Sequence, residues 1–237
     1  MSALYDFSGS GLGTFTFDPV SRFQVIGVND TVETTLGATP IVNAKAHSVS
    51  ITITDDASKR ELKLEKRVDI KCPDESKRRT IDISTTEARY MAAVAILYIK
   101  KHGRDQLYND YFGVIDVAPA VVDRFKKLLE PSPKPLSCSP PAGSCGDWFA
   151  HSNKDGIFYC DKYFSQKGIQ DICNVHSANS LRGGTTLRML TTLLFRTSDR
   201  KLDCAACKRL NDSDKIFSAG NYEVSIQNLS GTPRVRC

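Results

Sequence analysis

The sequence has no apolar stretch of about 18 residues, the length that a membrane-spanning helix needs. Residues 1–6 carry neither the basic nor the apolar segment of a signal peptide. Positive charge is not concentrated either, because the net charge of +5 comes from scattered lysines and arginines without the interleaved aromatic side chains of a nucleic-acid-binding surface. We therefore expect no membrane span and no nucleic-acid partner.

Histidine is scarce, and the histidines stand singly in separate segments, with no His-x-x-x-His pair. A lone histidine is usually a surface or hydrogen-bonded residue, so we expect no metal site built from them. A Gly-x-Ser-x-Gly nucleophile elbow is also missing, although a Ser-His-Asp triad built from separate segments stays open. A cysteine nucleophile would need Cys204 or Cys207 beside His151 or His176, and no local motif supports that pairing. The four histidines are His47, His102, His151 and His176.

Cysteine is absent from the first 71 residues but abundant after them, with eight in all. An even number of cysteines in the last two-thirds of a chain is typical of a disulfide framework formed in an oxidising compartment. We therefore expect a secreted protein and suppose that an upstream leader is missing from this sequence. Three Asn-x-Ser/Thr sequons, at Asn29, Asn211 and Asn228, permit glycosylation, although some occur by chance. The cysteines are Cys72, Cys138, Cys145, Cys160, Cys173, Cys204, Cys207 and Cys237.

Two regions of different character follow one another along the chain. Residues 1–71 alternate apolar and polar side chains, which predicts strands, including a hairpin with arms 48–54 and 59–67 around a turn at 55–58. From residue 72 onward the pattern becomes helical, apart from loops and short strands over 138–173. A capping box at 84–87 predicts a helix that begins there and ends at Gly103. Further helices are predicted at 119–130, at about 185–196 and over 208–228, with Gly220 as a candidate break.

Several strings in the second region, and one in the first, resemble a known family. Residues 160–165 read Cys-Asp-Lys-Tyr-Phe-Ser, residues 111–113 read Tyr-Phe-Gly, and residues 218–222 read Ser-Ala-Gly-Asn-Tyr ahead of a terminal cysteine. In this order the strings resemble segments of the deuterolysin family of fungal zinc endopeptidases. Residues 4–25 are similar to the β-rich propeptide that precedes the catalytic domain of that family. The resemblance implies an α+β chain with a propeptide-like region at 1–71 and a mostly helical, disulfide-stapled, zincin-like domain at 72–237.

The resemblance also implies three disulfide bridges: Cys72–Cys138, Cys145–Cys160 and Cys173–Cys237. Spacing alone does not choose among the pairings of eight cysteines. Cys204 and Cys207 have no clear counterpart in the family. A Cys-x-x-Cys pair can be redox-active, half of a metal site or a structural loop, and we favour a local or mutual structural bridge because no βαβ context and no second pair is present.

The chemistry of the family depends on a helix that reads Thr-Thr-Leu-His-Glu-x-x-His, in which both histidines bind zinc and the glutamate takes a proton from the zinc-bound water. Residues 185–192 read Thr-Thr-Leu-Arg-Met-Leu-Thr-Thr instead. Aligned on Thr-Thr-Leu, the ligand positions are Arg188 and Thr192, and the glutamate position is Met189. Arg188 has no lone pair for a cation and Met189 cannot act as a base, so we expect that zinc is lost and no cofactor replaces it.

The third zinc ligand of the family is an aspartate further along the chain, for which Asp199 and Asp203 are the nearest residues here. If one of them occupies that position, it could form a salt bridge with Arg188, although both could equally be solvated loop acids. Arg188, Thr192, Asp199 and Asp203 are the candidate binding residues, and an arginine in a closed cleft would favour a carboxylate group.

Because the chain resembles the family but lacks its zinc ligands, we predict a secreted, non-catalytic pseudopeptidase that binds a protein or peptide partner. Three other functions stay open: an active metalloendopeptidase with atypical ligands, an effector or toxin that acts on another organism, and a purely structural surface protein. Stoichiometric zinc with chelator-sensitive cleavage would identify the first, and a pull-down comparing the chain with its Arg188→Ala variant would test the second. A structural protein would show no saturable partner.

Overall fold

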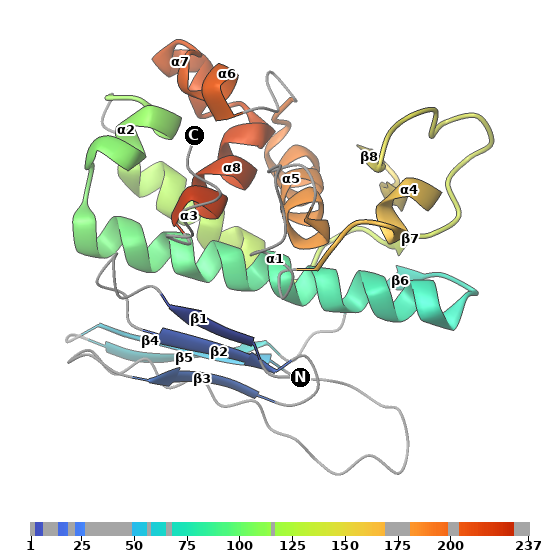
Figure 1. Ribbon diagram of the computed structural model, residues 1–237, viewed down its shortest axis with the longest axis horizontal. Helices are drawn as coiled ribbons and strands as arrows, with labels where there is room; N and C mark the ends of the chain where they lie inside the picture. The colour runs from blue at the N-terminus through green and yellow to red at the C-terminus, as the bar shows by residue number, and fades with distance from the viewer. Residues whose placement is uncertain are drawn as a thin grey trace. The chain divides into compact units, whose positions relative to one another are not determined.

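The computed structural model of the protein describes five strands within residues 3–64 and, after them, residues 68–114, 117–168, 181–198 and 204–229 (Figure 1). The chain divides into two compact units, residues 1–67 and 68–237. The first unit contains only strands among its described residues, and the second contains helices together with a small sheet. The fold class is therefore α+β.

The first unit contains a three-stranded antiparallel sheet and a separate hairpin. β1 (Ala3–Asp6), β2 (Thr14–Asp18) and β3 (Arg22–Ile26) pair in that order, and the register places Phe15 opposite Val25. β4 (Val49–Asp55) and β5 (Ser58–Leu64) form the hairpin that the alternation predicted.

The second unit is built around one long helix, α1 (Glu75–His102). Its middle, residues 91–99, is apolar on every side, which is typical of a helix that lies inside a protein. α1 packs against α3 (Ala118–Leu129), α5 (Arg182–Phe195) and α8 (Ala219–Leu229). None of the helices within the described residues is both long enough and apolar enough to cross a membrane.

Three short helices complete the helical part: α2 (Gln106–Phe112), α6 (Cys204–Lys208) and α7 (Asp212–Lys215). The rings of Phe112, Phe125 and Tyr222 meet edge to face, with centroids 5.2–6.1 Å apart, so that one aromatic cluster joins α2, α3 and α8. Such contacts are worth about 0.5–1.5 kcal/mol each beyond the buried area. The core of the second unit therefore lies where these helices meet α1.

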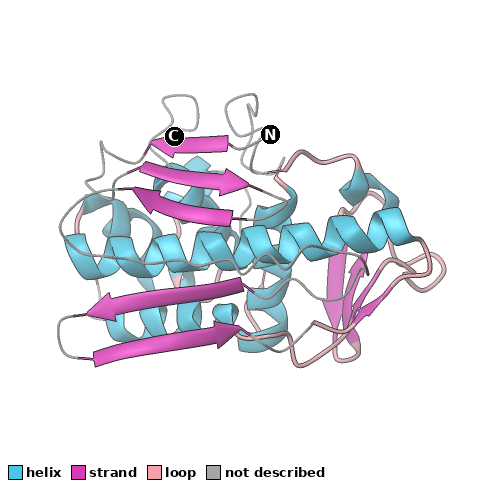
Figure 2. Ribbon diagram, turned by 90° about the horizontal axis from the view of Figure 1, so that it is seen from below, coloured by secondary structure: helices cyan, strands magenta, loops and turns pink. Residues whose placement is uncertain are grey.

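The sheet of the second unit lies beside the N-terminal part of α1 (Figure 2). Its strand order is β6 (Ile70–Lys71), β7 (Leu136–Ser137), β9 (Gly156–Tyr159) and β8 (Ala150–Asn153). The first two pairings are parallel, and β8 and β9 form an antiparallel hairpin. The short helix α4 (Asp161–Phe164) follows β9 directly.

The predicted start of the first helix was wrong. Asp74 caps α1, because its side chain accepts a hydrogen bond from the amide of Lys77, so the helix begins nine residues before Ser84. The hydroxyls of Ser84 and Thr85 instead donate to the carbonyl of Ile81 within the helix. The predicted end is confirmed, because Gly103 closes α1 with a φ of 64°.

The other predicted helices were right in part. α3 begins one residue before the predicted position, with Pro119 in its first turn. The range predicted as one helix, 208–228, contains the last residue of α6, all of α7 and most of α8, because Asn211 caps α7 and the chain turns again at Phe217–Ser218. Gly220 lies inside α8 and does not break it. α2 was not predicted, although Asp105 and Gly113 are recognisable boundary residues that cap its two ends.

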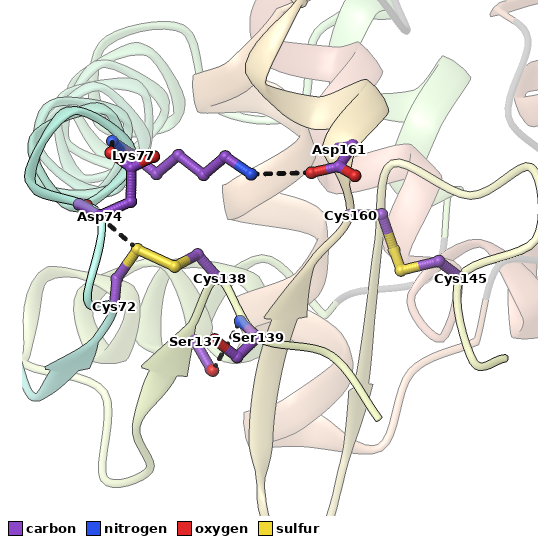
Figure 3. A network of polar contacts seen from close by, with 9 residues as sticks. All are labelled: Cys72, Asp74, Lys77, Ser137, Cys138, Ser139, Cys145, Cys160 and Asp161. Carbon is purple, nitrogen blue, oxygen red and sulfur yellow. Dashed lines mark hydrogen bonds and ion pairs between the residues drawn. A yellow bond between two sulfur atoms is a disulfide. The ribbon is translucent and has the colours of Figure 1, made fainter. Parts of the chain in front are cut away.

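Two of the three predicted disulfides are present, Cys72–Cys138 and Cys145–Cys160 (Figure 3). The first ties the segment before α1 to the end of β7, and the second ties the loop before β8 to the start of α4. Lys77 of α1 forms an ion pair with Asp161 of α4 at 2.8 Å, and this hydrogen bond raises the pKa of Lys77. Cys173, Cys237 and the side chain of Cys204 lie outside the described residues.

We predict that the two bridges differ in how much they stabilise the chain. In the chain-entropy model, a bridge that closes a longer loop restricts the unfolded chain more, so a separation of 66 residues gives about 4 kcal/mol and one of 15 gives about 3 kcal/mol. Urea unfolding of Cys72→Ser/Cys138→Ser and Cys145→Ser/Cys160→Ser variants measures both losses. A larger loss from the second pair would contradict the entropic explanation.

Candidate functional site

The candidate site lies on α5, the helix that corresponds in the resemblance to the zinc-binding helix. α5 begins at Arg182, three residues before the predicted start, so Gly183 and Gly184 lie in its first turn rather than before it. Gly183 is required there because α5 and α1 approach closely: a Cβ at this position would lie 2.7 Å from the Cβ of Glu87. The glycine brings the two helices together and buries most of the next two turns of α5.

Arg188, which the resemblance aligns with a zinc ligand, is buried in the helical core. It is 4% exposed, and its Nε lies 3.6 Å from Oε2 of Glu223 in α8. Glu223 is fully buried, so a guanidinium and a carboxylate neutralise each other inside the protein. Removing two charges from water is costly, and the pairing compensates for that cost only while both partners are present.

Glu223 was not among the predicted site residues. The sequence signals it only by an acidic side chain between the apolar residues Tyr222 and Val224, in a segment predicted to be helical. In the structure, both neighbours are fully buried. The aspartates expected near Arg188, Asp199 and Asp203, lie outside the described residues. Among the described residues, α8 supplies a carboxylate partner of Arg188.

The other two residues that the resemblance aligns with the zinc motif, Met189 and Thr192, serve packing and local hydrogen bonding. Met189 is 3% exposed and belongs to the apolar core. Thr192 is partly buried, and its hydroxyl donates to the carbonyl of Arg188 at 3.1 Å, while Thr191 donates to the same oxygen at 2.7 Å. Among the described residues, no three His, Cys, Asp or Glu side chains gather closely enough to hold a metal ion. A permanently charged arginine does not fit a zinc site, and we derive no chemistry from that metal.

A second buried polar cluster joins α5 to α1 and to the end of β9. The hydroxyl of Tyr163 bonds the hydroxyl of Ser84 and lies 2.9 Å from that of Thr186, and the hydroxyl of Tyr159 donates to Thr186 at 3.3 Å. Burial raises the pKa of both tyrosines well above the usual value. Both phenols are therefore neutral at ordinary pH and hold the helices together as hydrogen-bonding groups.

His151 on β8 lies beside a serine, which raises the question of a nucleophile–base pair. Its Nε2 is 2.9 Å from Oγ of Ser144, but Ser144 Oγ also donates to the carbonyl of Pro141 at 2.7 Å. Because a hydroxyl has one proton, His151 Nε2–H must be the donor to Ser144. The imidazole therefore does not activate the serine, and the contact fixes the turn before β8.

The strand beside α5 at the edge of the described sheet is β8. β8 packs against α5 and is the last strand in the order of the described sheet. The amide of Cys160 donates to the carbonyl of Phe149, so these two residues form a hydrogen-bonded pair of the hairpin. This pair determines which of the following pairs are hydrogen-bonded. Since hydrogen-bonded and non-hydrogen-bonded pairs alternate in an antiparallel ladder, the backbone N–H and C=O of Ser152 point away from β9. An edge of this kind can accept another extended chain.

Trp148 stands two residues before β8 and is 56% exposed. It is the only tryptophan of the chain. Its amide donates to the carbonyl of Cys145 at 2.8 Å, and the bridge from Cys145 to Cys160 fixes this turn to the framework. Tryptophan is enriched where proteins bind one another, so an exposed indole on a fixed turn marks a candidate contact surface.

Comparison of the chain with models of known protein families and with curated protein sequences finds no match.

We predict that the Arg188–Glu223 pair is much more sensitive to the loss of one partner than of both. Arg188→Met removes a positive charge that lies 3.6 Å from a buried carboxylate and should lower the free energy of unfolding by about 3–5 kcal/mol. The double variant Arg188→Met/Glu223→Leu should recover most of that loss. Urea unfolding of the two single variants and the double variant measures the coupling. The exposed pair Arg78–Glu75 is the control, where Arg78→Met should change little. Additive losses at 188 and 223 would show that the two residues do not interact.

We predict a contribution of His151 to the pH dependence of stability. Burial lowers the pKa of His151 in the folded protein, so the unfolded chain binds a proton more readily than the folded chain. The contribution of neutral His151 to the free energy of unfolding is fully present above the ordinary histidine pKa of about 6.5, and it is lost as the pH falls below that value. The fall in unfolding free energy from pH 7.5 to 5.5 should be smaller in His151→Gln than in the parent chain. An equal fall in both would assign the pH dependence to other groups.

Proposed function

We propose that the chain is a secreted, non-catalytic pseudopeptidase of deuterolysin-like ancestry that binds an extended segment of a partner protein or peptide. The observation that carries the proposal is the buried Arg188–Glu223 pair, at the position where the resemblance requires a zinc ligand. An arginine paired with a carboxylate gives the helix a structural role where an enzyme of the family has its metal.

The two disulfides support secretion, because such bridges form in oxidising compartments. Arg188 itself is nearly inaccessible, so in this proposal it does not contact the partner. The binding surface is instead the outer edge of β8 together with Trp148. Main-chain hydrogen bonds from Ser152 would hold the partner strand, and the indole would cover one end of it.

The proposal predicts that the full chain purified under native conditions contains no stoichiometric zinc and does not digest casein. Elemental analysis and a chelator-controlled digestion assay measure both properties. Stoichiometric zinc with chelator-sensitive cleavage would identify an active metalloendopeptidase with atypical ligands and overturn the proposal.

Binding is tested on an array of immobilised peptides in extended sequence contexts. Ser152→Pro removes the outward N–H of the edge strand and should abolish binding, whereas Ser152→Ala keeps the N–H and should leave binding intact. Trp148→Ala should weaken binding strongly, and Phe217→Ala, which removes an exposed aromatic side chain outside the β8 edge, is the matched control. Equal binding by Ser152→Pro and Ser152→Ala would exclude the edge strand as the binding surface.

A further inference from the structure

One motif in the described residues is not used by the proposed function: the sequon Asn211-Asp212-Ser213. Asn211 is exposed and stands immediately before α7, on a turn between two short helices. The amide of Asp214 donates to Asn211 Oδ1 at 2.9 Å, and the hydroxyl of Ser213 donates to the same oxygen at 2.7 Å. The asparagine and the hydroxyl residue of the sequon are therefore in direct contact on the surface.

Neither of the other two sequons is described on an exposed turn. Asn29 lies outside the described residues, and Asn228 lies within α8, where the backbone is helical. Asparagine acceptors for glycans are typical of surface loops in secreted proteins. Asn211 is the sequon asparagine that the described residues place on an exposed turn.

The disulfides give an independent reason to consider glycosylation. Bridges such as Cys72–Cys138 and Cys145–Cys160 are typical of chains that fold in an oxidising compartment such as the lumen of the endoplasmic reticulum, and the inference rests on the secretion that the proposed function includes. In eukaryotes that lumen is also where Asn-x-Ser/Thr sites receive their glycans, before the chain has folded. A chain that forms these bridges there meets the glycosylation machinery on the same route.

We propose that Asn211 carries an N-linked glycan. In the transfer, a bond forms between Asn211 Nδ2 and the anomeric carbon of a sugar, while the bond from that carbon to the phosphate oxygen of a lipid-linked oligosaccharide diphosphate breaks. The lipid diphosphate leaves, and the amide nitrogen loses one of its two protons. No oxidation or reduction takes place.

The folded turn is compatible with this modification. Nδ2 donates one hydrogen bond, to Oδ2 of Asp214 at 2.9 Å, and the glycosylated amide keeps one N–H for it. Oδ1 remains free of the sugar bond and continues to accept from Asp214 N and from Ser213. The cap of α7 therefore persists with the glycan attached.

The position of the glycan gives it a physical role. The neighbouring Asp212 accepts a hydrogen bond from the amide of Val114 at 3.0 Å, which joins this turn to the end of α2. Val114 is 68% exposed, the most exposed large apolar side chain in the described residues. A glycan on Asn211 places polar groups on the turn that is hydrogen-bonded to this residue.

The test uses the full chain behind a cleavable leader, translated with microsomes and scored for translocation by protease protection. Translocated chains are analysed with and without peptide glycosidase treatment by mass spectrometry of the peptide that contains residue 211, and the glycan is scored as the mass that the treatment removes. We expect a glycan at Asn211 that disappears in Asn211→Asp and Ser213→Ala and remains in Ser213→Thr. Asn211→Asp is the sharpest variant, because aspartate caps the helix as well as asparagine does.

Asn29→Gln and Asn228→Gln serve as controls, and neither should change the Asn211 peptide. Translocated chains with an unmodified Asn211 would overturn the proposal. Persistence of the glycan signal in Asn211→Asp would overturn it as well, because the sugar would then be on another residue. The readout is the mass of one peptide, so failure here is distinguishable from failure of the peptide-binding proposal.

Discussion

The buried ion pair of Arg188 and Glu223 joins α5 to α8 in the core of the second unit. A guanidinium and a carboxylate inside a helical core stabilise each other only while α5 and α8 stay in register. Gly183 fixes how closely α5 packs against α1, because the absence of a side chain lets α5 approach α1 at Glu87. The hydroxyl cluster of Tyr163, Ser84 and Thr186 then connects α5 and α1 to α4, and Tyr159 extends it to the end of β9. An ion pair therefore joins α5 to α8, a close approach at Gly183 joins it to α1, and hydroxyl hydrogen bonds join it to α4.

Local patterns predicted the local parts of this fold. The β4–β5 hairpin and α3 follow from alternation and from helical periodicity near Pro119, and both signals lie within the segment that they describe. The start of α1 was wrong because two capping sequences compete, at Asp74 and at Ser84, and the buried position of Ser84 against Tyr163 favours the earlier one. The break after α6 was missed because Asn211 is a strong helix cap that was considered only as a sequon residue.

The candidate site could be predicted only in part. The resemblance placed Arg188, Met189 and Thr192 on one helix, and the structure places all three on α5. Glu223 could not be assigned to Arg188 from the sequence, because the two residues are 35 positions apart and nothing local specifies which helix faces which. The Ser144–His151 contact could not be predicted from the sequence either, because a turn brings the two side chains together. The carbonyl of Pro141, which accepts the hydroxyl proton of Ser144, decides the direction of the hydrogen bond.

The solitary tryptophan has a consequence for how this protein can be observed. Intrinsic indole emission usually reports the packing of a hydrophobic interior, but Trp148 is 56% exposed at the end of a disulfide-fixed turn. Its spectrum in the folded state should already be close to that of a hydrated indole, so fluorescence will follow unfolding of the helices only weakly. The emission maximum of Trp148 will instead shift to the blue when a bound partner removes the indole from water at the β8 edge. The chain therefore contains its own optical probe for that surface.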